Sequence, residues 1–192
     1  MTKRLTPTLI KGTLLASVVL IGMKAWAASN EAHPRSDLAP IPALDLPRYL
    51  GDWYEIAKFP NRFQRKCVGF TKATYTALPD GRVQVENRCR LQDGTTDVAI
   101  GVARQVGPAN SARLKVRFAP AILSFIPMVW GDYWVIDLDR EYGLAAVSEP
   151  GRDYLWILSR TPTVSKAAYD ALVARLSGQG LDVRKLVRTP QA

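Results

Sequence analysis

Apolar and polar residues alternate over eight short segments that follow residue 50, and this period of two predicts β-strands. Turn residues, such as those of Pro79-Asp80-Gly81, separate the segments at short and regular intervals. Such spacing is typical of an antiparallel meander, in which each strand pairs with the next one. The predicted strands span residues 53–58, 69–76, 83–90, 98–104, 112–118, 133–138, 142–147 and 154–160.

The hydrophobic period changes to that of a helix after the last of these segments. One helical face collects four apolar side chains at spacings of i, i+3, i+4 and i+7, namely Tyr169, Leu172, Val173 and Leu176. Ser165 or Thr163 can cap the start of this helix, and Gly178 or Gly180 can end it. Residues 181–187 predict a further short strand.

We therefore predict an all-β protein. Its core is expected to be an eight-stranded antiparallel up-and-down β-barrel, with one C-terminal α-helix packed on the outside. Eight strands in a meander can close into a barrel, which removes the exposed sheet edges.

Residues 1–27 have the pattern of a secretory signal peptide. A basic start precedes the apolar run 14–23, and Ala25-Trp26-Ala27 forms a small-residue cleavage site. The run is shorter than the ~18 apolar residues that a membrane-spanning helix needs, although an uncleaved N-terminal anchor is the alternative. We expect a Pro- and Ala-rich lead over residues 28–47 and the barrel domain over residues 48–192.

This leader predicts an exported protein that is periplasmic or secreted. Association with the outer membrane stays open, but no cysteine near the cleavage site offers a thiol for lipid attachment. The formal net charge is +9, and cleavage would leave +5. The remaining cations are scattered singly, which argues against nucleic acid as a partner and weakly favours contact with an anionic surface.

The chain has two cysteines, Cys67 and Cys89, on either side of the turn at Pro79-Asp80-Gly81. A hairpin folded about that turn would bring them together, and export favours a disulfide over two free thiols. The pair makes a poor metal site because no histidine or third cysteine accompanies it. We expect no metal and no cofactor.

Three short motifs resemble those of the lipocalin family, and they occur in the family's order and spacing. Gly51-Asp52-Trp53 opens the first strand, Asp139 and Tyr142 stand where the family often has Thr-Asp-Tyr, and Arg160 ends the eighth strand. The resemblance covers residues 45–190 and extends to bacterial outer-membrane lipocalins and apolipoprotein D. Trp53 and Arg160 are expected to stack at the closed end of the barrel. We therefore assign these motifs a structural role.

Strand alternation predicts which side chains line the barrel. An inward Arg160 turns Trp156 inward, and an inward Trp53 does the same for Glu55 and Ala57. On strand 98–104 either the larger or the smaller alternating set can face inward. The candidate ligand-binding residues are Glu55, Tyr75, Val85, Asn87, Leu114, Val116, Phe118, Tyr133, Val135 and Trp156.

This lining is apolar with a few polar groups, which suits one amphipathic small molecule. A barrel filled by its own side chains is the alternative. Trp156 is the strongest candidate for ligand contact, because the resemblance places its position in the cavity wall. An inward Glu55 needs an Arg, a Tyr or a polar ligand head as partner.

Two loops are expected at the open end of the barrel. The uncharged loop 119–130 can form a lid, contact a membrane as a peripheral surface, or form a homodimer interface. The loop 61–66 carries three cations, which would suit an anionic lipid head group or membrane surface.

We expect a non-enzymatic carrier or store of fatty acids or lysophospholipids that serves cell-envelope lipid maintenance or stress. The sole histidine, His33, lies in the lead, so a Ser-His-Asp triad is not expected. The alternatives are a lipocalin-type isomerase or de-epoxidase that uses Glu55 or Tyr133, and a stress-protective barrel that binds nothing.

Overall fold

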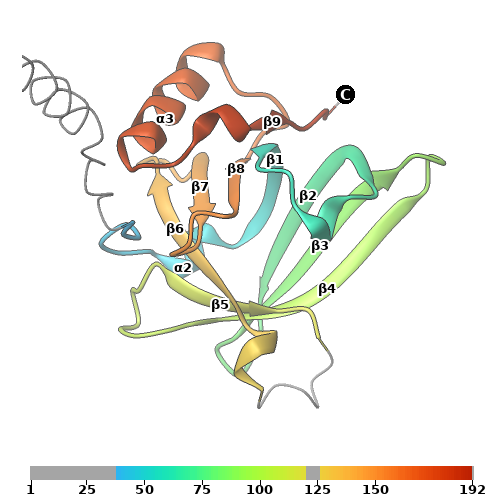
Figure 1. Cartoon of the computed structure of the whole chain (residues 1–192). Helices are drawn as coiled ribbons and strands as arrows, with labels where there is room; N and C mark the ends of the chain where they lie inside the picture. Colours follow the sequence, from blue (N-terminus) through green and yellow to red (C-terminus); the bar gives the residue numbers. More distant parts are fainter. Residues whose placement is uncertain (1–37, 120–125, 192) are drawn as a thin grey trace, which may run out of the picture. The chain divides into compact units, whose positions relative to one another are not determined.

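The computed structural model describes residues 38–119 and 126–191. The predicted signal peptide 1–27, residues 28–37 of the lead and residues 120–125 of loop 119–130 lie outside the described residues. The strands form one sheet in the order β2-β3-β4-β5-β6-β7-β8-β1-β9, and β2 also pairs with β1, so the sheet closes on itself (Figure 1). The predicted eight-stranded antiparallel barrel is confirmed, and β9 is an addition to it.

The strand bounds agree with the predicted segments to within a few residues. The strands are β1 Gly51–Lys58, β2 Cys67–Ala77, β3 Val83–Leu91, β4 Thr96–Gln105, β5 Arg113–Arg117, β6 Gly131–Leu138, β7 Leu144–Ser148, β8 Leu155–Ser159 and β9 Val187–Arg188. The helices among the described residues are α2 Leu46–Tyr49 and α3 Lys166–Gly178, with 3-10 turns at Arg62–Gln64, Pro127–Val129 and Val183–Lys185. The sequence pattern did not reveal α2.

The predicted seventh strand starts two residues too early. Tyr142 has a φ of 59° and belongs to the turn before β7, where its N–H donates to the Asp139 carbonyl at 3.1 Å. This left-handed conformation and the turn hydrogen bond keep Tyr142 out of the pairing between β6 and β7, in which Leu138 lies opposite Ala145. The motif residues Asp139 and Tyr142 thus form the tight turn at the closed end of the barrel.

Helix α3 packs on the outer face of the barrel, as predicted. Its N-cap is Ser165, whose hydroxyl accepts a hydrogen bond from the Ala168 N–H at 3.2 Å. Leu172 and Leu176 are fully buried in an apolar cluster that also contains Ile157 of β8. The barrel interior holds a second, separate cluster around Trp53.

A β-bulge in β1 changes which side chains enter the barrel. Glu55 lies opposite Leu158, but Ala57 lies opposite Ile157, so one residue is inserted between them. Ala57 therefore belongs to the outer cluster beneath α3, and the prediction that it faces inward was wrong. After the bulge, Lys58 lies opposite Trp156 and shares its inner side.

The closed end of the barrel is built around Trp53, as predicted. The Arg160 guanidinium lies 4.0 Å from the centre of the Trp53 ring, and the Trp53 Nε1–H donates to the Tyr49 carbonyl at 2.7 Å. Arg160 also donates to the carbonyls of Arg48 and Asp52, at 2.7 and 2.9 Å. Gly51 has a φ of 91°, and a Cβ there would lie 3.3 Å from Arg160 Nη1. Glycine suits both the conformation and the close approach.

Residues 187–191, which we call the C-terminal segment, complete the wall between β1 and β2. Those two strands pair only over Gly51–Tyr54. Beyond that stretch, the Thr189 N–H donates to the Ile56 carbonyl at 3.0 Å, and the Phe70 N–H donates to the Pro190 carbonyl at 2.7 Å. Figure 1 shows β9 beside β1. The segment approaches β2 so closely that a Cβ on Gly69 would lie 2.8 Å from the Pro190 oxygen.

Candidate functional site

Most of the predicted lining residues lie on the inner side of the barrel. Tyr75, Val85, Leu114 and Val135 are buried in the inner cluster, and three partly buried side chains pack against it, namely Val116, Tyr133 and Trp156. Asn87 pairs with Ala73 of that cluster and is half-buried. The structure thus brings these residues together around one interior.

The smaller side chains of β4 face inward. Gly101 and Ala103 lie opposite Val85 and Val83, and all four are buried. The larger set faces solvent, with Ile100 60% exposed. The structure therefore shows which of the two alternating sets of β4 side chains faces inward. Because that set is the smaller one, the interior is wider.

Phe118 does not have the burial expected of a lining residue. It is 45% exposed and follows the end of β5, because the strand stops at Arg117. A Cβ on Gly101 would lie 2.7 Å from the Phe118 ring. Phe118 therefore covers the inward-facing Gly101 near the open end of the barrel.

The interior is filled at its closed end and accessible at its open end. Along the inner side of β3 and β4, Val83 and Ala103 near the closed end are buried, Asn87 is half-buried, and Ala99 opposite it is exposed. Near the closed end, a small cavity of about 10 Å³ remains beside Tyr133. A ligand can thus enter the half of the barrel nearer the open end.

Three tyrosines form the floor of this interior. The Tyr133 hydroxyl lies 2.9 Å from the hydroxyl of Tyr49 and 2.9 Å from that of Tyr75. Burial raises the pKa of Tyr75 to about 12, and it raises the pKa values of Tyr49 and Tyr133 well above their ordinary value. All three phenols are therefore neutral over the physiological range of pH.

Alkaline pH is expected to destabilise the fold through these tyrosines. The folded-state pKa of Tyr75, about 12, exceeds that of an unfolded tyrosine, about 10, so its contribution is complete below pH 10 and is lost as pH rises towards 12. Urea unfolding at stepped pH should show a loss of about 2–3 kcal/mol from this group alone. Tyr75→Phe should flatten that decline; an equal decline in wild type and variant would contradict the assignment.

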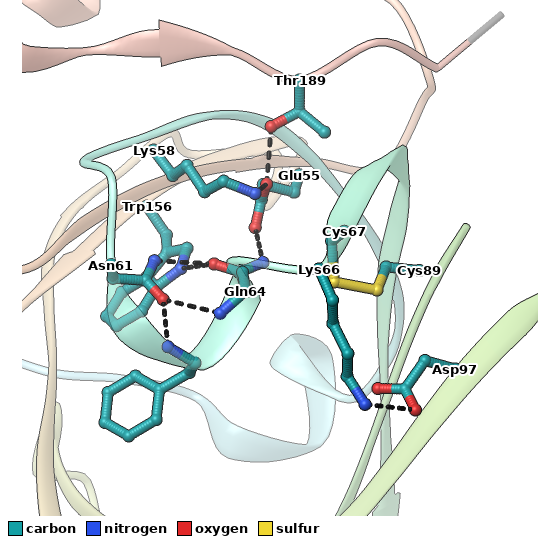
Figure 2. Close-up of a disulfide and its surroundings, with 11 residues drawn as sticks. Glu55, Lys58, Asn61, Gln64, Lys66, Cys67, Cys89, Asp97, Trp156 and Thr189 are labelled. Carbon is teal, nitrogen blue, oxygen red and sulfur yellow. Dashed lines mark hydrogen bonds and ion pairs between the residues drawn. A yellow bond between two sulfur atoms is a disulfide. The ribbon is translucent and has the colours of Figure 1, made fainter. Parts of the chain in front are cut away.

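A polar cluster lies at the open end, beside the start of β8 (Figure 2). Glu55 is only 3% exposed, and its carboxylate accepts hydrogen bonds from Lys58 Nζ at 2.8 Å, Gln64 Nε2 at 2.5 Å and the Thr189 hydroxyl at 2.5 Å. Gln64 Oε1 in turn accepts from the Trp156 Nε1–H at 3.0 Å. The partners of Glu55 are thus a lysine, an amide and a hydroxyl, and not the Arg or Tyr that the sequence suggested.

Gln64 is the residue of this cluster that the alternation could not reveal, because it lies in a loop. Asn61 caps the 3-10 turn Arg62–Gln64, and its Oδ1 accepts from the N–H groups of Phe63 and Gln64. The Asn61 amide donates to Gln64 Oε1 at 2.8 Å. The available signal was the Asn-x-x-Gln spacing, which resembles a capping box.

The predicted disulfide between Cys67 and Cys89 is present and adjoins this cluster (Figure 2). It joins the first residue of β2 to the end of β3, with a Cα–Cα distance of 5.6 Å. Lys66 forms an ion pair with Asp97 at 2.8 Å on the neighbouring strand. Together these links fasten the loop 61–66, and with it Gln64, to the barrel wall.

Among residues 38–119 and 126–191, no group of three or more His, Cys, Asp or Glu side chains could hold a metal ion. No helix in this part of the chain is both long and apolar enough to span a membrane.

A closed antiparallel barrel with a filled base, an accessible open end and an outer helix defines a small-ligand-binding barrel. The chain belongs to the lipocalin family, because residues 44–191 match the model of the lipocalin-like domain. Family membership supports binding or transport of a small hydrophobic molecule.

Curated relatives agree with this membership. Temperature-induced lipocalin-1 of Arabidopsis thaliana is 42% identical over 82% of this chain and 85% of the relative. Outer membrane lipoprotein Blc of Escherichia coli is 41% identical over 86% of this chain and 89% of the relative. Insecticyanin of Manduca sexta, 20% identical with a TM-score of 0.62 over 81% of this chain and 85% of that one, shares the fold.

Proposed function

We propose that this lipocalin binds and carries amphipathic lipids, either fatty acids or lysophospholipids, for lipid maintenance or stress protection in the periplasm or outside the cell. The observation that carries this proposal is the polar cluster of Glu55, Lys58, Gln64 and Trp156, which is set in a mostly apolar wall at the accessible end of the barrel. An apolar chain would lie in the interior, and a polar head would lie beside the cluster.

Lys58 is the group that would meet an anionic head. Its side chain is 15% exposed and lies on the inner side, opposite Trp156. An ammonium group has three donors, and Lys58 uses one of them on Glu55. The other two donors can bind carboxylate or phosphate oxygens.

An enzymatic role for Glu55 receives less support from the geometry. Its carboxylate accepts from a lysine, an amide and a hydroxyl, so three of its roughly four acceptor sites are engaged by the protein itself. Binding is therefore the function that the described residues support best.

Binding is tested by replacing Trp156, whose ring lies on the inner side next to the polar cluster. Trp156→Ala should weaken octadecenoic acid or lysophospholipid binding about tenfold, because an aromatic contact and the anchor of Gln64 are both lost. Isothermal titration calorimetry measures this directly.

Trp134→Ala is the matched control for this experiment, because Trp134 packs with the outer cluster. It should leave the affinity unchanged. Equal affinities of the Trp156 variant and the wild type would remove Trp156 from the site. Absence of binding to the wild type would refute the carrier function itself.

The rim of the open end has the composition of a peripheral membrane contact. Phe63, Val68 and Met128 are 59, 49 and 93% exposed, and the loop 61–66 that holds Phe63 also carries Arg62 and Arg65. Exposed apolar side chains next to cations suit an anionic bilayer surface better than a second copy of the same cationic rim. Sedimentation with phosphatidylglycerol vesicles should retain the protein, whereas phosphatidylcholine vesicles should not; a stable dimer without vesicle binding would favour the homodimer.

A further inference from the structure

The tyrosine floor has one more hydrogen-bond donor than it can use internally. Each phenol carries one hydroxyl hydrogen, so Tyr49, Tyr75 and Tyr133 together carry three. Two hydrogen bonds connect them, Tyr49–Tyr133 and Tyr75–Tyr133. Within the described residues, these hydroxyls have no further partner, so one hydrogen is left over.

This surplus does not depend on the direction of either bond. Each of the two bonds can be donated from either side, so the remaining hydrogen can sit on any of the three oxygens. No arrangement consumes it. Ionisation does not remove it either, because burial holds the pKa of Tyr75 at about 12 and those of Tyr49 and Tyr133 higher than usual.

The space next to these hydroxyls is small and otherwise apolar. Besides the three tyrosines, the cavity is lined by Leu46, Val83, Val85, Ala103, Leu114 and Val116. None of these side chains can accept a hydrogen bond. The cavity volume of about 10 Å³ suits one oxygen-sized group. Because an unpaired donor in such a place is costly, an acceptor that fits there is favoured.

We propose that Tyr49, Tyr75 and Tyr133 form a donor site for an acceptor oxygen carried on the inner, otherwise apolar end of the ligand. This inference rests on the proposed lipid binding and narrows it. The preferred ligand is a long apolar molecule with a ketone, aldehyde or ester oxygen far from its charged head, such as an oxo fatty acid. A plain methyl end would leave the spare hydrogen unpaired.

A positional series of probes tests the donor site on the mature wild-type chain. Octadecanoic acid is compared by calorimetry with oxo-octadecanoic acids whose ketone is moved stepwise towards the methyl end. One position near that end should bind about fivefold tighter than octadecanoic acid, as expected for a net hydrogen bond of about 1 kcal/mol. Ketones close to the carboxylate should gain nothing.

Two variants separate the donor from simple packing. The triple variant Y49F/Y75F/Y133F has no hydroxyl left, so it should bind the best ketone and octadecanoic acid equally. Tyr49→Phe is the matched control, because two hydroxyls and one hydrogen bond still leave one hydrogen. It should keep a preference for the ketone.

If the triple variant does not fold, the donor site can still be tested on the wild type alone. Hydrogen bonding should move the infrared stretch of the bound ketone to lower frequency than in an apolar solvent. A flat positional profile, or an unshifted stretch, would overturn the donor site while leaving lipid binding intact. If no member of the series binds, the proposed lipid binding fails and the donor site fails with it.

Discussion

Trp53→Ala is expected to lower the free energy of unfolding by about 3–5 kcal/mol, the range for removing a large aromatic side chain from a core. Trp53 is completely buried, and its ring centre lies 4.8 Å from that of Tyr49. The substitution also removes the aromatic face beneath Arg160 and leaves the Tyr49 carbonyl without its donor. Urea unfolding followed by circular dichroism measures the loss.

Trp53→Phe provides the graded comparison for this prediction. Phenylalanine keeps an aromatic face for Arg160 but lacks the indole N–H. Trp53→Phe should therefore lower the free energy of unfolding by less than Trp53→Ala does. If alanine costs less than about 1 kcal/mol, the typical effect of any point substitution, Trp53 does not organise the closed end.

Removing the disulfide is expected to cost about 3 kcal/mol, because Cys67 and Cys89 are 22 residues apart and the bridge restricts the unfolded chain. The double substitution C67S/C89S should lower the midpoint of urea unfolding accordingly. It should also weaken lipid binding, since the bridge fastens the start of β2 next to the loop that carries Gln64.

The reducing agent supplies the control for this prediction. Dithiothreitol should lower the melting temperature of the wild type and leave that of the double serine variant unchanged. An unchanged wild-type melting temperature after verified reduction of the bridge would contradict a stabilising role.

Local patterns predicted the elements of this fold well. Alternation located the eight barrel strands, and the Ser165 cap with the 3.6-residue period located α3, because these signals come from neighbours in the sequence. The bulge in β1 could not be seen. Ile56 and Ala57 are both apolar, so an inserted residue there leaves no break in the pattern. Simple alternation therefore assigns Ala57 and Lys58 to the wrong faces of the sheet.

The candidate site was predictable only in part, because its polar contacts come from distant segments. Glu55, Tyr133 and Trp156 were found from alternation and from the family resemblance. Their partners could not be found, since Thr189 lies 134 positions from Glu55 and Tyr49 lies 84 positions from Tyr133. Residues this far apart meet only after the whole sheet has closed.

The C-terminal segment has a consequence for how the chain folds. The Gln191 amide donates to the carbonyls of Glu55 and Thr71, which are 136 and 120 positions away, so the wall between β1 and β2 is completed by very long-range contacts. Contacts of this kind slow folding, because the intervening chain must be ordered before they can form. We expect refolding to pass through a barrel that is open along this line and to finish when residues 187–191 insert.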